Sequence, residues 1–211
     1  IIIHEVMGRN CGWLTAATAM EYRNRLGKRE FLPSILIEKK RWDVDAVYIP
    51  EMEIDIEKEA RRLKKRMDEK DSINIFLSEG AGIDSIIQEM EENNEEVKRD
   101  AFGHIRLDEI NPGQWFAKQF AKRINSEKVL VQKSGYFARS AKPNKKDLDL
   151  IRQSADMAVS CALSGQSGVI GLDEDQANQL QCIEFKRITG GKPFDTKIDW
   201  FKTMLKDIGQ L

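Results

Sequence analysis

Cysteine, histidine and long hydrophobic runs are all scarce in this sequence. Its 211 residues include three cysteines, at positions 11, 161 and 182, and two histidines. The cysteines are widely spaced and form no CxxC pair, so we expect neither a disulfide framework nor a zinc site. No apolar run reaches the roughly 18 residues that cross a bilayer, and no signal-peptide pattern opens the chain. We therefore expect a cytoplasmic protein with no membrane partner.

A strong charge of one sign is also lacking. The chain carries 34 basic and 35 acidic residues, for a formal net charge of −1. Its overall field gives no reason to expect a nucleic acid as partner, although a small anion could still bind a local basic pocket. With 41% apolar residues, the chain is long enough and apolar enough to bury a sizeable core.

What the sequence does contain is an alternation of short apolar runs with amphipathic stretches, which favours an α/β layered fold. Strands are predicted at 1–6, 46–49, 73–77, 129–131, 168–172 and 181–185. Three-and-four spacing of apolar residues predicts helices over 12–26, 56–67, 114–124 and 148–162. Asn144, with Asp147 three residues on, is a plausible cap for the last helix. Two charge-dense stretches, 39–42 and 91–100, are predicted to be exposed.

Glycine-bearing polar segments follow three of the predicted strands. The first strand leads into residues 7–12, Met-Gly-Arg-Asn-Cys-Gly, directly before a helix. Backbone N–H groups in such a turn can face an anion, and Arg9 can grip a phosphate with two hydrogen bonds. Taken alone, Gly8 and Gly12 are explained as well by a tight strand-to-helix turn.

The other two segments follow the strands at 73–77 and 129–131. Glu79 is well placed to accept hydrogen bonds from sugar hydroxyls, although an acidic residue before glycine is also common in exposed loops. Lys133, Tyr136 and Arg139 could surround one phosphate, and Gly135 permits close approach of the backbone. Because all three segments stand at equivalent strand ends, we predict an anion-binding site there.

The histidines and tryptophans carry little functional signal. His4 and His104 have no neighbours at the spacing of metal ligands or of a catalytic triad, so both are predicted to be structural. The four tryptophans are dispersed, which is more typical of core or domain-contact residues than of a stacking platform.

These same residues resemble the phosphofructokinases, and more closely their pyrophosphate-dependent group, over essentially the whole chain. The resemblance rests on the segments Glu-Val-Met-Gly-Arg at 5–9, Ser-Glu-Gly at 78–80, Gly-His-Ile-Arg-Leu-Asp at 103–108, Gly-Tyr-Phe-Ala-Arg-Ser at 135–140 and Gly-Gly-Lys-Pro-Phe-Asp at 190–195. It implies a three-layer parallel-sheet α/β fold, of which this chain is the carboxy-terminal portion of a two-domain enzyme.

By the same resemblance, 1–134 and 189–211 form the smaller, sugar-phosphate-binding domain, and 135–188 complete the larger, amino-terminal domain. The chain also opens on three isoleucines without an initiator methionine, which is typical of a strand already in progress. We therefore expect a fragment that lacks its amino-terminal half, with apolar surface left exposed or covered by another chain.

The implied reaction is reversible phosphoryl transfer from pyrophosphate to the 1-hydroxyl of fructose 6-phosphate, with Mg²⁺ neutralising the phosphates. Carried over by motif, the fructose 6-phosphate ligands are Met7, Gly8, Arg9, Glu79, Tyr136 and Arg139. Lys133 is added by its chemistry as a ligand of the 6-phosphate, and Arg9 could also stabilise the transferred phosphoryl group. A homodimer is the expected assembly.

No Thr-Ile-Asp-Asn-Asp segment, which carries the catalytic base in that family, occurs in the sequence. The resemblance therefore places the base, the pyrophosphate loops and the main Mg²⁺ ligand in the missing half, and implies that this chain alone is inactive with no catalytic or metal residue of its own.

Two alternatives stay open. The enzyme could be an ATP-dependent 6-phosphofructokinase, although those enzymes typically show a histidine where Tyr136 stands. The chain could instead be a non-catalytic sugar-phosphate-binding module that uses the same strand ends. A purely structural protein would leave the three polar strand ends unexplained.

Overall fold

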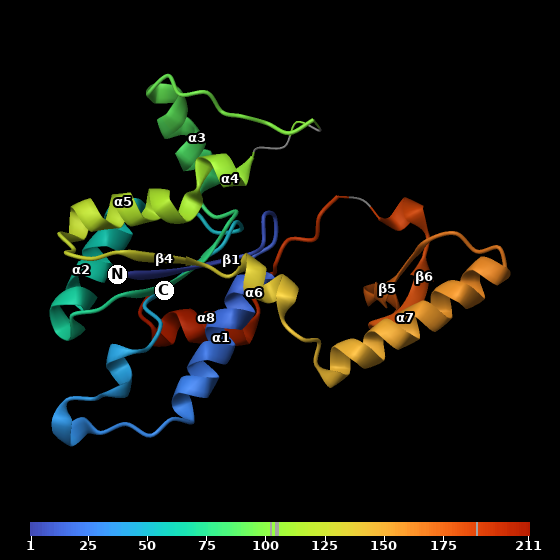
Figure 1. Cartoon of the computed structure of the whole chain (residues 1–211), viewed down its shortest axis with the longest axis horizontal. Coiled ribbons are helices and arrows are strands. Elements are labelled where there is room, and N and C mark those ends of the chain that lie inside the picture. The colour runs from blue at the N-terminus through green and yellow to red at the C-terminus, as the bar shows by residue number, and fades with distance from the viewer. Residues whose placement is uncertain (102, 104–105, 189) are drawn as a thin grey trace. The chain divides into compact units, whose positions relative to one another are not determined.

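The computed structural model describes residues 1–101, 103, 106–188 and 190–211 (Figure 1). The chain folds into two compact units, Ile1–Tyr136 with Lys192–Leu211 (unit 1) and Phe137–Gly191 (unit 2). These limits lie within a few residues of the predicted division at 134 and 189. The assignment of the middle segment to a larger domain stays a prediction.

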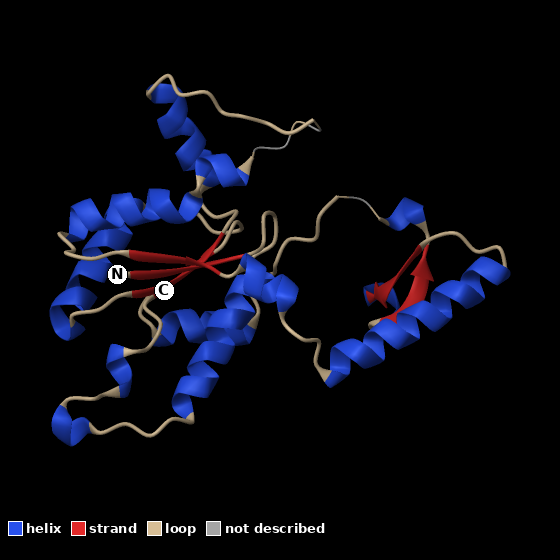
Figure 2. Ribbon diagram, in the orientation of Figure 1, coloured by secondary structure: helices blue, strands red, loops and turns tan. Residues whose placement is uncertain are grey.

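Unit 1 is built on a four-stranded sheet in which every pair of strands is parallel (Figure 2). Its strands are β1 (Ile2–Val6), β2 (Ala46–Tyr48), β3 (Asn74–Ser78) and β4 (Leu130–Lys133), in the order β2-β3-β1-β4. The carboxyl ends of parallel strands meet at one edge of a sheet. The parallel α/β fold predicted from the sequence is confirmed.

Successive side chains of each strand point to opposite faces of this sheet, so both faces carry apolar residues, and helices cover both. The helices of unit 1 are α1 (Trp13–Gly27), α2 (Ile56–Lys70), α3 (Ile83–Glu92), α4 (Leu107–Ile110), α5 (Pro112–Ile124) and α8 (Asp199–Asp207), with single 3₁₀ turns at Pro33–Ile35 and Lys39–Arg41. Tyr48 packs with α2 and α5 in one core, and Val47 packs with α1 and α8 in the other. The result is three layers (Figure 1).

The tail that follows α8 closes the outer edge of the sheet. The Val47 N–H of β2 donates to the side-chain oxygen of Gln210 at 2.9 Å, and the Gln210 side-chain NH₂ donates to the Val47 carbonyl at 2.9 Å. The Gln210 side-chain amide thus makes the two hydrogen bonds that a peptide group of a neighbouring strand would make.

Unit 2 contains α7 (Lys145–Leu163) and an antiparallel hairpin of β5 (Val169–Asp173) and β6 (Gln179–Ile183). Its remaining elements are 3₁₀ turns at Glu174–Gln176 and Phe185–Arg187, and α6 (Gly135–Ser140), which begins in unit 1. The parallel arrangement does not extend to β5 and β6, because Ala177 and Asn178 adopt left-handed conformations that reverse the chain between them.

The predicted start of α7 is confirmed. The Asn144 side chain accepts from the Asp147 N–H at 3.1 Å, and the Asp147 carboxylate accepts from the Asn144 N–H at 2.9 Å, which is a capping box. None of the helix's residues is buried, and Val159 and Leu163 are exposed by 60% and 86%. Large apolar side chains are therefore exposed on this helix, and their cover by a missing half or another chain stays a prediction.

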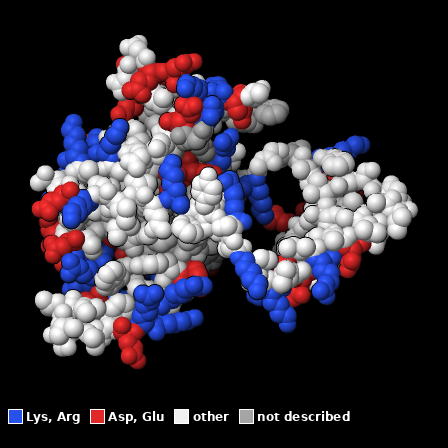
Figure 3. Space-filling model, viewed as in Figure 1, with Lys and Arg blue, Asp and Glu red and all other residues white. Residues whose placement is uncertain are grey.

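The surface carries both signs of charge, as the nearly equal numbers of basic and acidic residues indicate. Basic and acidic side chains are interspersed over the face drawn in Figure 3. Lys39–Arg41 and most of 91–100 are exposed, as predicted. Of the four tryptophans, Trp115 and Trp200 pack against the cores, whereas Trp13 and Trp42 are 54% and 52% exposed and are not core residues. A domain-contact role for these two stays a prediction. Among the described helices, none combines the length and apolarity needed to cross a bilayer.

Candidate functional site

The loops that follow β1 and β3 are bonded to each other at the carboxyl edge of the sheet. The Glu79 N–H donates to the Val6 carbonyl at 2.9 Å, and the Gly8 N–H donates to the Glu79 carboxylate at 3.2 Å. The Ser78 hydroxyl donates to the Gly8 carbonyl at 2.6 Å. These bonds hold the Glu79 carboxylate beside the backbone of the first loop.

Glycine is required where these two loops touch. A Cβ at Gly80 would lie 1.8 Å from the Arg9 carbonyl oxygen, which no side chain can do. Gly8 has φ +143°, and a Cβ there would lie 2.5 Å from the Cys11 carbonyl oxygen. The absence of side chains at these positions therefore lets the backbone of Arg9 press against the β3 loop.

The end of β4 is tied to the end of β1 through Glu5. One oxygen of its buried carboxylate accepts from the Gly113 N–H at 2.9 Å, and the other lies 3.5 Å from the Lys133 ammonium. The Glu5 carbonyl accepts from the Ser134 N–H at 2.9 Å and from its hydroxyl at 3.0 Å. Lys133 is thereby placed on the same edge as the first two loops, with part of its charge balanced by Glu5.

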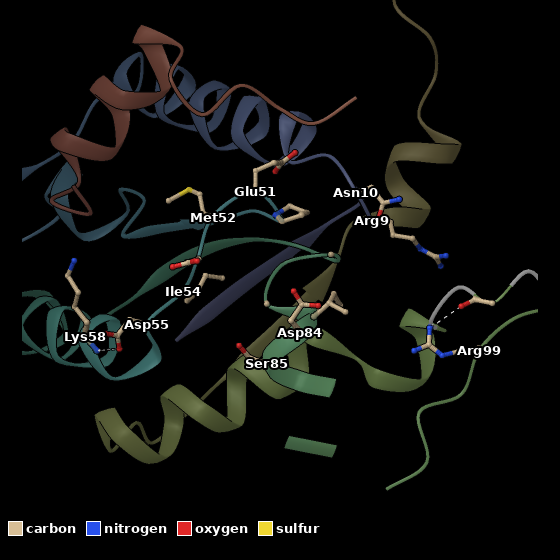
Figure 4. Close-up of a pocket in the computed structure, with 16 residues that line it drawn as sticks. Arg9, Asn10, Glu51, Met52, Ile54, Asp55, Lys58, Asp84, Ser85 and Arg99 are labelled. Atoms are coloured by element: carbon tan, nitrogen blue, oxygen red, sulfur yellow. Dashed lines mark hydrogen bonds between the residues drawn. The ribbon is translucent and has the colours of Figure 1, made fainter. Parts of the chain in front are cut away.

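A cavity of about 1190 Å³ opens at this edge, over the ends of β1, β2 and β3. Figure 4 shows Arg9 and Asn10 reaching it from the β1 loop, and Asp84 and Ser85 from the start of α3. Its charged lining is mixed, with Arg9, Lys58 and Arg99 as cations and Glu51, Glu53, Asp55 and Asp84 as carboxylates. A volume of this size is ample for a phosphorylated sugar.

Glu51 is a residue of this site that the sequence analysis missed. It follows β2, and its two carboxylate oxygens accept from the Gly12 N–H at 3.0 and 3.1 Å. One of them also accepts from the Phe194 N–H at 2.7 Å. The carboxylate therefore holds the start of α1 and the 190–195 segment together, and lies favourably at the positive end of the helix. The signal was its place directly after a predicted strand.

The seven predicted ligands are only partly brought together. Met7, Gly8, Arg9 and Glu79 lie in the bonded loops, and Arg9 lines the cavity. The other three come from the β4 end. Lys133 joins the edge through Glu5, Tyr136 is 84% exposed at the limit of unit 1, and Arg139 belongs to unit 2. Their roles as ligands stay predictions.

His4 is structural, as predicted. Its ring stacks on Phe76 with centroids 4.8 Å apart and shares a hydrogen bond of 2.9 Å with the Asn74 side chain. Burial lowers the pKa of His4, and this outweighs the bond to Asn74, which raises it. His104 lies outside the described residues.

The expectation that Mg²⁺ is bound mainly outside this chain stays a prediction. In the part of the chain that the structure describes, no group of three or more His, Cys, Asp or Glu side chains is arranged to ligate a metal ion.

Comparison with known proteins gives consistent results. The phosphofructokinase family model matches residues 1–162. The chain is 58% identical over 210 residues to the pyrophosphate–fructose 6-phosphate 1-phosphotransferase of Methylomonas methanica, covering all of this chain and 51% of that protein. It is 53% identical to the protein of the same name from Propionibacterium freudenreichii, covering 52% of it, and 51% identical to that of Mastigamoeba balamuthi, again covering 51%.

A crystal structure of a pyrophosphate-dependent phosphofructokinase from Nitrosospira multiformis superimposes with a TM-score of 0.57 at 16% identity, covering 98% of this chain and 47% of that one. This likeness supports the fold. The chain spans about half the length of the curated relatives it matches. The family model covers more than half of the chain and the relatives match all of it, so the chain belongs to the phosphofructokinase family.

Proposed function

We propose that this chain supplies the fructose 6-phosphate site of an enzyme that transfers a phosphoryl group reversibly between pyrophosphate and the 1-hydroxyl of the sugar. The observation that carries the proposal is the bonded pair of loops, in which Gly8 holds the Glu79 carboxylate beside Arg9. The names of relatives that are 51–58% identical over the whole chain support the same substrates.

Each side chain has a part that follows from its chemistry. Glu79, held by the Gly8 N–H, accepts hydrogen bonds from the sugar hydroxyls. Arg9 faces the cavity and stabilises negative charge on the transferred phosphoryl group. Lys133, steadied by Glu5, binds the 6-phosphate, with Tyr136 and Arg139 completing that group. Met7, beside Gly135, packs against the sugar.

The remaining machinery is assigned outside this chain. The proton acceptor for the 1-hydroxyl, the pyrophosphate loops and the principal Mg²⁺ ligand have no counterpart among the residues of the site, so we assign them to a second portion of the whole enzyme. Pyrophosphate is favoured over ATP as donor because all four curated relatives carry it in their names. A cytoplasmic homodimer is part of the proposal.

Calorimetric titration of the chain with fructose 6-phosphate tests the site directly. Binding is expected, and fructose without phosphate should bind far more weakly. Arg9→Ala and Glu79→Gln should each weaken binding by about 10-fold or more, since each removes a charge-assisted hydrogen bond. Arg25→Ala is a matched control, because Arg25 is an exposed arginine of α1 paired with Glu21.

The full gene product tests the reaction. Assays with pyrophosphate and with ATP as separate donors should give turnover with pyrophosphate, and Arg9→Ala should lower kcat. Sugar binding without turnover by the full gene product would instead support a binding module. If both substitutions bind fructose 6-phosphate as well as the unchanged chain does, the proposed site is wrong.

A further inference from the structure

Two of the three cysteines meet in unit 2, although they are well separated in sequence. Cys161 lies near the end of α7, and Cys182 lies in β6, against which α7 packs. The hairpin packs against α7 through both of its strands, and Cys161 is near enough to Cys182 to raise its pKa. Both are free thiols. The expectation of no disulfide framework rested on the spacing of the cysteines along the chain, and that spacing does not show which cysteines lie close together in the fold.

A glycine gives the Cys182 sulfur its space. A Cβ at Gly168 would lie 2.9 Å from the Cys182 sulfur and 2.4 Å from the Ile183 carbonyl oxygen. Gly168 stands just before β5, whose Ile170 pairs with Cys182 across the hairpin. The chain between α7 and β5 can therefore pass close over the sulfur. The hairpin register and the helix together fix where both thiols lie.

The surroundings suit thiol chemistry better than metal binding. Within the described residues no third His, Cys, Asp or Glu completes a ligand set around the pair. Both cysteines are only partly buried, so a small oxidant can reach them. Burial, the neighbouring Cys161 and the Glu184 carboxylate all raise the pKa of Cys182. The raised pKa keeps Cys182 protonated, so the first attack on the oxidant is assigned to Cys161.

We propose that Cys161 and Cys182 form a redox-active pair that closes to an intramolecular disulfide on exposure to a hydroperoxide. In the first step the Cys161 thiolate attacks hydrogen peroxide, forming an S–O bond and breaking the O–O bond, and hydroxide leaves. In the second step the Cys182 sulfur attacks the sulfenic acid, forming the S–S bond, and water leaves. The two thiols lose two electrons in all and peroxide gains two.

The bond would tie the last turn of α7 to β6. Because this site lies wholly inside unit 2, the inference does not depend on the sugar-phosphate site of unit 1. A dithiol reductant reverses the modification, and the dithiol form is the one the structure contains.

Oxidation of the reduced, folded chain with one equivalent of hydrogen peroxide tests the proposal. Thiols counted after denaturation should fall from three to one, and the mass should fall by two hydrogen atoms. A peptide map should show Cys161 joined to Cys182. Cys11→Ser is the matched control and should still lose two thiols, whereas Cys161→Ser and Cys182→Ser should each give no internal cross-link.

The same oxidation in concentrated urea separates folded geometry from chance encounter. The cross-link should form at least about 10-fold more slowly there, because the unfolded chain no longer holds the two sulfurs together. The proposal is overturned if three thiols persist, if the cross-linked peptide contains Cys11, or if the bond forms equally fast in urea. The peptide map of the unsubstituted chain shows which two cysteines are joined, so it tests the proposal even if a serine variant fails to fold.

Discussion

The carboxylate of Glu51 is predicted to contribute more to the stability of unit 1 than any single contact at the exposed rim of the cavity. In Glu51→Ala the N–H groups of Gly12 and Phe194, both buried, lose their acceptor. Hydrogen bonds to a charged group are each worth about 1.5–3 kcal/mol. The favourable position at the start of α1 is included in those values, so the free energy of unfolding should fall by about 3–6 kcal/mol.

The four tryptophans make this measurable, because all of them lie in unit 1. Urea unfolding followed by tryptophan emission therefore reports on that unit alone, and Trp200 lies 5.8 Å from the Phe194 ring, between ring centroids. Glu53→Ala is the control, since Glu53 is an exposed carboxylate on the same cavity. Its effect should stay within about 0.5 kcal/mol.

The reasoning would be refuted by a small effect. If Glu51→Ala lowers the free energy of unfolding by less than about 1 kcal/mol with an unchanged denaturant slope, its hydrogen bonds do not hold the two segments together. Glu51→Gln keeps one acceptor oxygen and loses the charge, so it should fall between the alanine variant and the unchanged chain.

Two further predictions follow from close contacts and ion pairs. Gly80→Ala should force the backbone away from Arg9 and lower both the melting temperature and fructose 6-phosphate affinity, while Gly191→Ala, which meets nothing within 4 Å, should change neither. The Arg187 hydrogen bonds hold the pKa of Asp173 below its usual range, so the pair stabilises unit 2 above about pH 4 and this contribution is lost as pH falls through the lowered pKa. Arg187→Gln should flatten that pH dependence, measured by hydrogen exchange in β5 and β6, and an unchanged profile would contradict the assignment.

The longer periodic helices could be predicted from the sequence, but α3, α4, α6 and α8 were missed. In α8, Phe201, Met204 and Leu205 do show helical spacing with Ile208 just after the helix, and all four are buried. In α3, the single fully buried residue is Ile86. Both helices are short, so the pattern repeats only about twice, and short patterns are the least reliable.

Pairing direction and bonding partners could not be predicted. The apolar runs at β5 and β6 are the same whether the strands pair in parallel or antiparallel, because the pattern records burial and not partner. Glu79 was identified because it follows a predicted strand. The same criterion, applied to the predicted strand at 46–49, would have identified Glu51. It could not tell that Glu51 binds two backbone N–H groups, since one of them belongs to Phe194, 143 positions away.

The Gln210 amide on β2 has a consequence for the order of events during synthesis. β2 is made before the group that occupies its outer edge, which lies 163 positions further along the chain. An unpaired strand edge is a template for association with another chain, and contacts between distant positions form slowly. A nascent chain therefore carries an open edge until its tail has left the ribosome, and folding of the sheet can be completed only after translation has reached that residue.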